Sequence, residues 1–385
     1  MENLLVNKVA AVKEVRQAAE YQKKKQACIL TGLAGSSKPV FFAAADKLLG
    51  GKGSMAFVTA SREEIRTYRR ELNYLYPDLP MQELYPVSLP RVQADTQSLE
   101  LQAGRAAALR FLSGEERGIV FITAEALQQK QLRPSGMSGK ALQLAVGEEH
   151  EQRNIAAALL DLGYERTEQV DALGQFCLRG DILDVYPINS SAAVRIEWFD
   201  NELDAMRSFD VDTQRSLQTL TSIKIAPLKV DESFSYDADI FEYCAADTMV
   251  VVDEPVHVFS MLEKLDKENK EHASELFNKQ ELIEQLAANG AVLVSALGHS
   301  YLQQLPSLNI PVRAVAPYNK NTNLLVEDLQ NWLAEGITPL IMLSGSIKAR
   351  GFADNLRNYG LKGHFAQKSL SLIHISEPTR RTPIS

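Results

Sequence analysis

The sequence predicts an α/β protein that carries an inserted small α+β domain and then the start of a further small α/β domain. Over most of the chain, short apolar runs alternate with amphipathic helical segments, the pattern of a parallel sheet flanked by helices. Between residues 140 and 215 this pattern changes to one helix and several short strands. A length of 385 residues suits about two or three domains, and 45% apolar with 23% charged residues is ordinary for globular proteins.

Changes of pattern divide the chain into five segments. Pro, Gly and Ser in residues 134–140 indicate a connector at the first domain boundary. The residues from Ser371 onward carry no periodicity and resemble translated sequencing-adapter DNA, so we expect a non-native tail outside the fold; a genuine disordered tail is the alternative. The segments are the first part of the α/β domain (1–139), the inserted domain (140–215), the second part of the α/β domain (216–315), the truncated further domain (316–370) and the tail (371–385).

Each apolar strand of the α/β domain is expected to lead into a helix, as in a parallel sheet with crossover helices. The expected strands are 27–30, 55–59, 81–85, 118–123 and 249–254, and the expected helices are 39–49, 61–76, 99–112 and 124–131. The inserted domain should contain a helix at 151–162, and the further domain a helix, a strand and a helix at 326–335, 338–344 and 347–359.

A glycine-bearing loop joins the first strand to its helix, which is the frame of a phosphate-binding loop. Measured against GxxxxGK[ST], Gly32 and Lys38 fit, and Gly35 lies between them. Ser37 stands where Gly would let the backbone approach the phosphates, and Pro39 stands where a hydroxyl should hold magnesium. Proline also lacks the N–H that such a loop supplies. The loop is therefore interpreted as a structural relic that does not bind ATP productively.

Two acids end the apolar strand MVVVDE, in the form of a Walker B motif. Asp253 would orient magnesium and Glu254 a water if the site were active. Strands of Val that end in acids are common, and the glycine loop is impaired. We therefore interpret both acids as inherited architecture, and no catalytic residue is predicted in this chain.

The charge and cysteine patterns exclude several classes of protein. A net charge of −8 argues against a protein that coats nucleic acid through an overall positive field. The first 26 residues contain no apolar run that suits a signal peptide or membrane span, so a cytoplasmic protein is expected. Cys28, Cys177 and Cys244 are widely separated, with no CxxC pair or His cluster, and are predicted to be buried thiols rather than a disulfide or metal site.

Residues 174–215 hold four Arg and no Lys, in strand-like alternation of apolar and charged residues. Alternation puts Arg195, Glu197 and Phe199 on one face, so a large ring shares a charged surface. Either Phe199 turns inward at the strand end, or this is a docking surface with an aromatic anchor beside Arg. Most of the nine carboxylates between Asp171 and Asp212 fall in turns or opposite an Arg, which favours a solvated, Arg-paired face over a metal or acid/base site.

The stretch FCLRGDILDVYPINSSAAVRIEWFDNELDAMRSFDVDTQRSL resembles the UvrB-homologous module of bacterial transcription-repair coupling factors (Mfd). The loop TGLAGSSKP, the segment VTASREEIRTYRRELNYLYPD and the strand VVVDEP are similar in order and spacing, so the resemblance extends over about residues 1 to 370. It implies a UvrB-like, RecA-like domain with a degenerate phosphate loop, and an inserted domain that recruits UvrA. The chain is then expected to be an N-terminal fragment.

The resemblance also implies the working residues. Family residues that contact UvrA match Arg179, Arg195 and Phe199, with Arg207 and Arg215 as weaker candidates. The missing C-terminal part would supply an ATP-dependent DNA translocase that uses ATP and magnesium, with RNA polymerase and double-stranded DNA as its partners. This fragment is expected to need no cofactor, metal or membrane, and to have no activity of its own. The alternative is a UvrB-like excision-repair subunit that binds or hydrolyses nucleotide, or binds DNA.

Overall fold

The computed structural model describes residues 4–87, 89, 99–134, 141–228, 236–296, 304–312, 315, 318–319, 321–343, 346–368 and 370–376. The chain forms two compact units, Met1–Val312 and Arg313–Ser385. Most of the connector expected at residues 134–140 lies outside the described residues, as does the tail beyond Ser376. No helix of the described residues is both long enough and apolar enough to cross a membrane.

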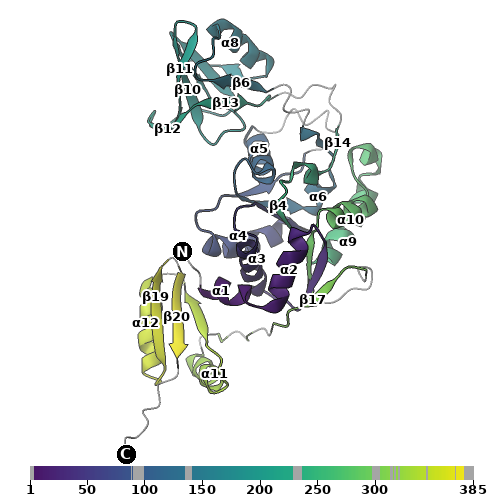
Figure 1. Ribbon diagram of the computed structural model, residues 1–385, viewed down its shortest axis with the longest axis vertical. Helices are drawn as coiled ribbons and strands as arrows, with labels where there is room; N and C mark the ends of the chain where they lie inside the picture. Colours follow the sequence, from purple (N-terminus) through teal and green to yellow (C-terminus); the bar gives the residue numbers. More distant parts are fainter. Residues whose placement is uncertain are drawn as a thin grey trace, which may run out of the picture. The chain divides into compact units, whose positions relative to one another are not determined.

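A parallel sheet of seven strands forms the centre of the first unit (Figure 1). All of its neighbouring strands pair in parallel, which confirms the α/β prediction. Its five inner strands are almost wholly buried because helices cover both faces, whereas the edge strands are partly exposed. In sheet order they are β17 (Ser307–Asn309), β1 (Cys28–Thr31), β16 (Val292–Ser295), β15 (Met249–Asp253), β2 (Met55–Thr59), β4 (Ile119–Thr123) and β3 (Met81–Leu84).

Alternate residues of each strand enter two separate hydrophobic cores. In β15, Val250 and Val252 join one core while Met249 and Val251 join the other. Helices α1 (Leu4–Ala10), α2 (Lys13–Lys23), α3 (Ser37–Leu48) and α4 (Arg62–Leu75) pack on the second of these cores. The first core receives α5 (Leu99–Ser113), α6 (Ala124–Gln128), the 3-10 helix η2 (Ile240–Tyr243), α9 (Pro255–Glu268) and α10 (Lys279–Ala288), and a further 3-10 helix, η3 (Lys270–Glu275), links the last two.

The inserted domain is a second, six-stranded sheet with its own core. The strands pair antiparallel except β7 with β8, and helix α8 (Gln152–Asp161) packs on one face of the sheet. The sheet order is β12 (Ser216–Leu220), β11 (Glu202–Phe209), β10 (Ala193–Phe199), β9 (Ile182–Val185), β8 (Gln175–Arg179) and β7 (Glu165–Arg166). A separate pair, β6 (Leu142–Ala145) with β13 (Ser222–Ile225), contributes to the same core.

The inserted domain continues past Arg215, where the sequence analysis placed its end. Strand β12 pairs with β11, and β13 pairs with β6 at the start of the domain. Residues 216–225 therefore complete this domain, because both strands find their partners within it. Beyond it, β5 (Gln131–Leu132) pairs with β14 (Tyr236–Ala238), which joins the chain before the insertion to the chain after it.

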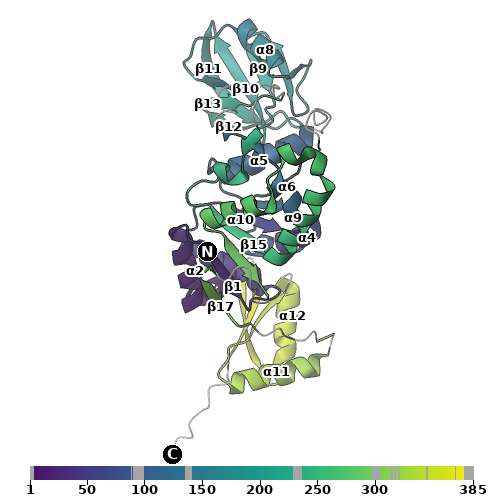
Figure 2. The ribbon, with the colours of Figure 1, turned by 90° about the vertical axis from the view of Figure 1, so that its right-hand side faces the viewer.

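The described residues of the second unit form two helices and a three-stranded antiparallel sheet (Figure 2). Its elements are α11 (Thr322–Ala334), β18 (Leu340–Leu343), α12 (Ser346–Arg357), β19 (Lys362–Lys368) and β20 (Leu370–Ser376). Strand β20 lies between the other two strands, although the sequence analysis excluded the residues from Ser371 onward from the fold. Leu372, Ile373 and Ile375 favour a strand, which accounts for this pairing.

Candidate functional site

The hairpin of β10 and β11 presents the residues that sequence reasoning singled out. Val194, Ile196 and Trp198 are at most 5% exposed and lie in the core of the inserted domain. Phe199, on the opposite face, is 77% exposed. The ring therefore points to solvent, and the alternative in which Phe199 turns inward is wrong.

The end of this hairpin is braced by the loop before α8. Trp198 donates its indole N–H to the carbonyl of His150 at 2.9 Å. The backbone of Leu203 bonds to Gly147 and Glu148 at 2.8 and 2.9 Å, so the loop lies along the start of β11. Phe199 consequently extends from a strand end that is hydrogen-bonded to a neighbouring segment.

A buried carboxylate organises the arginines of this face. Asp184 on β9 is in register with Arg195 on β10, and its side chain is only 3% exposed. Arg195 donates from Nε to Oδ1 at 2.6 Å and from Nη2 to Oδ2 at 2.8 Å, which is a bidentate pair. Arg179 on β8 donates to the same Oδ2 at 3.4 Å. The hydrogen bond from Asp184, aided by the charges of Asp184 and Glu197, raises the pKa of Arg195 although burial opposes this.

Two further groups fix Arg195 in place. Its guanidinium lies 4.7 Å from the ring centre of Phe209, and Nη2 also donates to Gln214 at 3.1 Å. Phe209 itself belongs to a small second core on this face, with Val170, Cys177 and Ala193. The guanidinium of Arg195 is therefore held at its edge by Asp184 and Gln214 and over its face by the ring of Phe209, while the side chain stays 18% exposed.

The remaining arginines of the stretch differ in their surroundings. Arg207, opposite Arg195 across β10 and β11, forms an ion pair with Glu197. Arg179 is the most open of the paired arginines, with its side chain 55% exposed. Arg215 is exposed just before β12. The structure thus brings Arg179, Arg195 and Arg207 onto one face of the sheet with Phe199. Alternation predicted this only for Arg195 and Phe199; the places of Arg179 and Arg207 follow from the strand pairing.

The sequence analysis treated the acids of this stretch as one Arg-paired face and did not single out Asp184. The sequence does contain a signal for Asp184, because strict alternation along β9 puts it on the face opposite Leu183 and Val185, which is the face of the arginines. What the sequence lacked was the strand order, which decides that the neighbours of Asp184 are arginines.

The relic nucleotide loop is the second candidate site, and its lysine is already neutralised. Lys38 Nζ lies 2.6 Å from Asp253 Oδ1 and 2.8 Å from Glu254 Oε1. The three side chains are 10%, 9% and 20% exposed. Burial alone would lower the pKa of Lys38, but the two carboxylates outweigh it and the pKa is raised. Burial and the same acids raise the pKa of the Tyr68 hydroxyl, which hydrogen-bonds Asp253.

Three N–H groups of the loop donate to acceptors within the loop. Ser37 N donates to Ala34 O and Lys38 N to Gly35 O, each at 3.2 Å. Ala34 N donates to the Ser37 hydroxyl at 3.0 Å, and Pro39 has no N–H. Phosphate-binding loops need these donors to point at the ligand. The arrangement therefore suits a closed structural turn and disfavours the nucleotide-hydrolase alternative.

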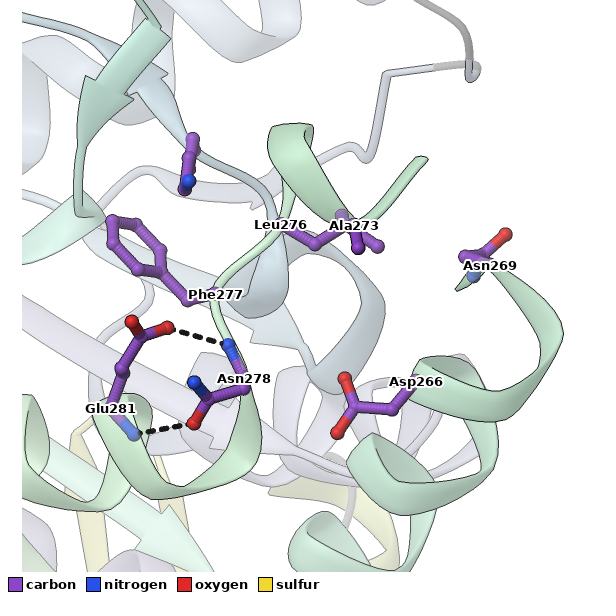
Figure 3. Close-up of a pocket in the computed structure, with 8 residues that line it drawn as sticks. Asp266, Asn269, Ala273, Leu276, Phe277, Asn278 and Glu281 are labelled. Atoms are coloured by element: carbon purple, nitrogen blue, oxygen red, sulfur yellow. Dashed lines mark hydrogen bonds between the residues drawn. The ribbon is translucent and has the colours of Figure 1, made fainter. Parts of the chain in front are cut away.

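A shallow cavity of about 240 Å³ lies between α9 and α10 (Figure 3). Its polar groups are engaged: Asn278 and Glu281 cap α10 reciprocally, and Asp266 accepts a hydrogen bond from Gln128. Elsewhere in the described part of the chain, no cluster of three or more His, Cys, Asp or Glu could hold a metal ion. Cys28 and Cys177 are buried free thiols as predicted, and Cys244 is free and partly buried.

Comparison with known proteins identifies the inserted domain. A family model described as the UvrB interaction domain matches residues 142–230. Transcription-repair-coupling factor of Bacillus subtilis (strain 168) is 36% identical over 203 residues, 52% of this chain and 17% of that protein. The chain is homologous to the N-terminal region of transcription-repair-coupling factors.

Two further transcription-repair-coupling factors extend this finding. The protein of Staphylococcus haemolyticus (strain JCSC1435) is 31% identical over 202 residues, 52% of this chain and 17% of the relative. That of Escherichia coli (strain K12) is 28% identical over 165 residues, 43% of this chain and 14% of the relative. The chain thus spans well under a fifth of the length of these transcription-repair-coupling factors. A solved structure called "Truncated XPD" aligns with 78% of this chain and 99% of its own, at a TM-score of 0.31 and 9% identity, too low to support an argument.

Proposed function

We propose that this chain is the N-terminal part of a transcription-repair coupling factor and that its inserted domain recruits UvrA of nucleotide excision repair to stalled RNA polymerase. The observation that supports this most is the braced hairpin with Phe199 77% exposed beside the Asp184–Arg195 pair. In the whole protein, RNA polymerase, double-stranded DNA, ATP and magnesium would be bound by a translocase motor outside this chain.

Binding rather than catalysis is the work that the chemistry supports. The ammonium of Lys38 is paired with both Asp253 and Glu254, and three N–H groups of its loop donate to acceptors within the loop. The face of the inserted domain, in contrast, combines an exposed aromatic ring with guanidinium groups. Aromatic and Arg residues dominate the energetics of protein interfaces because they bury large areas and make directed hydrogen bonds.

The expected docking mode follows from the exposures of these side chains. Phe199 would enter an apolar pocket of UvrA, while Arg179 and Arg195 would meet acidic groups beside it. An anchor of this kind, once desolvated, contributes on the order of 2 kcal/mol or more to binding. Loss of Phe199 or Arg195 should therefore weaken the complex by at least about tenfold, since about 1.4 kcal/mol is a factor of ten.

Titration calorimetry of UvrA with this 385-residue chain tests the proposal. Phe199→Ala and Arg195→Ala are each expected to reduce the affinity. Leu160→Ala and Arg133→Ala are matched controls: Leu160 is a 54% exposed apolar residue on α8, and Arg133 is an exposed, ion-paired arginine outside the inserted domain. The controls should bind as the unmodified chain does. Unchanged affinity in both Phe199→Ala and Arg195→Ala would refute UvrA docking through this face.

A further inference from the structure

We infer that Asp184 is a positioning residue of this docking face: it holds the Arg195 guanidinium in one orientation before UvrA arrives. The inference rests on the proposed function and names a residue that would itself stay out of contact with the partner. The side chain of Asp184 is 3% exposed, so it cannot present a charge to another protein. Its effect must pass through the arginines that it holds.

The sheet places Asp184 between its two arginine partners. It lies on β9, with Arg195 on the neighbouring strand β10 and Arg179 on the other neighbour, β8. All three hydrogen bonds made to its carboxylate among the described residues come from guanidinium groups. A buried carboxylate is tolerated only when it is paired, so folding itself draws both arginines to this position.

The bidentate pair determines which edge of Arg195 remains available. Nε and Nη2 are used by Asp184, and Nη2 is shared with Gln214. The ring of Phe209 lies beneath the guanidinium. The two N–H groups of Nη1 take no part in these hydrogen bonds, so Nη1 is the edge that can meet a carboxylate of the partner. Phe199 is four residues further along the same strand, on the same face.

Holding Arg195 in advance should strengthen binding. Ordering a long side chain at an interface weakens binding by about two- to twelvefold, and a side chain already fixed in the free protein avoids that cost. Arg179, with a single contact at 3.4 Å and a 55% exposed side chain, gains less from this effect. Asp184 therefore acts mainly on Arg195.

Positioning and net charge predict opposite results for Asp184→Asn. Asp184, Arg179 and Arg195 together carry a charge of +1, and loss of the carboxylate charge leaves +2. If the face acts only as a positive patch, the variant should bind an acidic partner more tightly and associate faster. If Asp184 positions Arg195, the variant should bind more weakly despite its extra positive charge, and it should dissociate faster.

Measurements of UvrA binding by the 385-residue chain distinguish the positioning role from the net-charge effect. Calorimetry gives the affinity, and kinetic measurements give the association and dissociation rates. Asp184→Asn is expected to weaken binding by about two- to twelvefold, mostly through faster dissociation. Asp46→Asn is the matched control, because Asp46 is another buried carboxylate paired with an arginine, Arg117, in the α/β domain. It should leave UvrA binding unchanged. In an Arg195→Ala background, Asp184→Asn should cause no further loss, because its target is gone.

A spectrum of the free chain provides a readout that does not depend on UvrA. The Nε–H of Arg195, bonded to Asp184, should give an arginine ¹H–¹⁵N signal that is protected from solvent exchange, and Asp184→Asn should remove that protection. Equal or tighter UvrA binding by Asp184→Asn, with Arg195→Ala and Phe199→Ala still weakened, would overturn the positioning role alone. If neither Arg195→Ala nor Phe199→Ala changes the affinity, the proposed function fails and this role fails with it.

Discussion

Replacing Lys38 by Met should strongly destabilise the α/β domain, because it leaves two acids without their cation. The Lys38 Nζ contacts at 2.6 and 2.8 Å each represent about 6 kcal/mol of Coulomb attraction at an effective dielectric constant of about 20. Most of this is offset by the cost of removing three charges from water, so the net value of the intact cluster is small. Removing one partner is different, since Asp253 is then buried and unpaired. A loss of about 3 to 5 kcal/mol in unfolding free energy is expected.

The assay must report on the correct domain. Trp198 lies in the inserted domain and Trp332 in α11 of the second unit, so tryptophan fluorescence does not follow the α/β sheet. The thiol of Cys28 in β1 reports on this sheet instead, because it is fully buried and burial raises its pKa to about 12. Its labelling by a thiol reagent at increasing urea concentration, read by peptide mass spectrometry, gives the opening free energy of the sheet.

Two companion variants make this result interpretable. Lys38→Met combined with Asp253→Asn should regain much of the lost stability, because the buried charge is removed together with its partner. Lys279→Met breaks an ion pair with Glu263 whose side chains are 33% and 52% exposed, and it should lower the stability far less than Lys38→Met does, because solvent screens exposed pairs. A loss below about 1 kcal/mol for Lys38→Met itself would mean that the acids are solvated, and the closed relic site would be refuted.

Two further predictions concern pH and helix capping. The pKa values of Lys38 and Tyr68 are raised in the folded chain, so their contribution to stability is complete below the pKa values of the unfolded chain and is lost as pH rises above about 10. Urea unfolding followed by circular dichroism should show this loss of stability, and the loss should be smaller in Lys38→Met. Asn278 accepts the N–H of Glu281 at 3.0 Å at the start of α10, so Asn278→Ala should lower stability by about 1 kcal/mol in the same assay, while Asn278→Asp, which can still cap the helix, should not.

Sequence reasoning predicted most of the architecture because the signals that it uses are local. Buried strands such as β15 appear as continuous apolar runs, and alternation along β10 separates Ile196 and Trp198 from Arg195 and Phe199. Only the structure could supply the pairing of distant residues. Lys38 and Asp253 are 215 positions apart, and Asp184 becomes important only because β9 lies between β8 and β10. The end of the inserted domain was set too early because the polar residues of β12 lack a strand-like alternation.

The Lys38 cluster and the Asp184 cluster both pair a buried carboxylate with a cation, but they differ in how far their charged side chains are exposed to solvent. In each, a carboxylate less than 10% exposed holds a cation at 2.6 Å. Around Lys38 the second partner is another acid, so the cluster has a net charge of −1, but every side chain of the cluster is at most 20% exposed and little of that charge faces solvent. Around Asp184 the second partner is another cation, and Arg179 is 55% exposed, so one positive charge is left over and faces solvent. A buried carboxylate shared by two arginines thus leaves a positive charge exposed on the face with Phe199, which supports the proposed docking function, whereas the charges around Lys38 are largely enclosed.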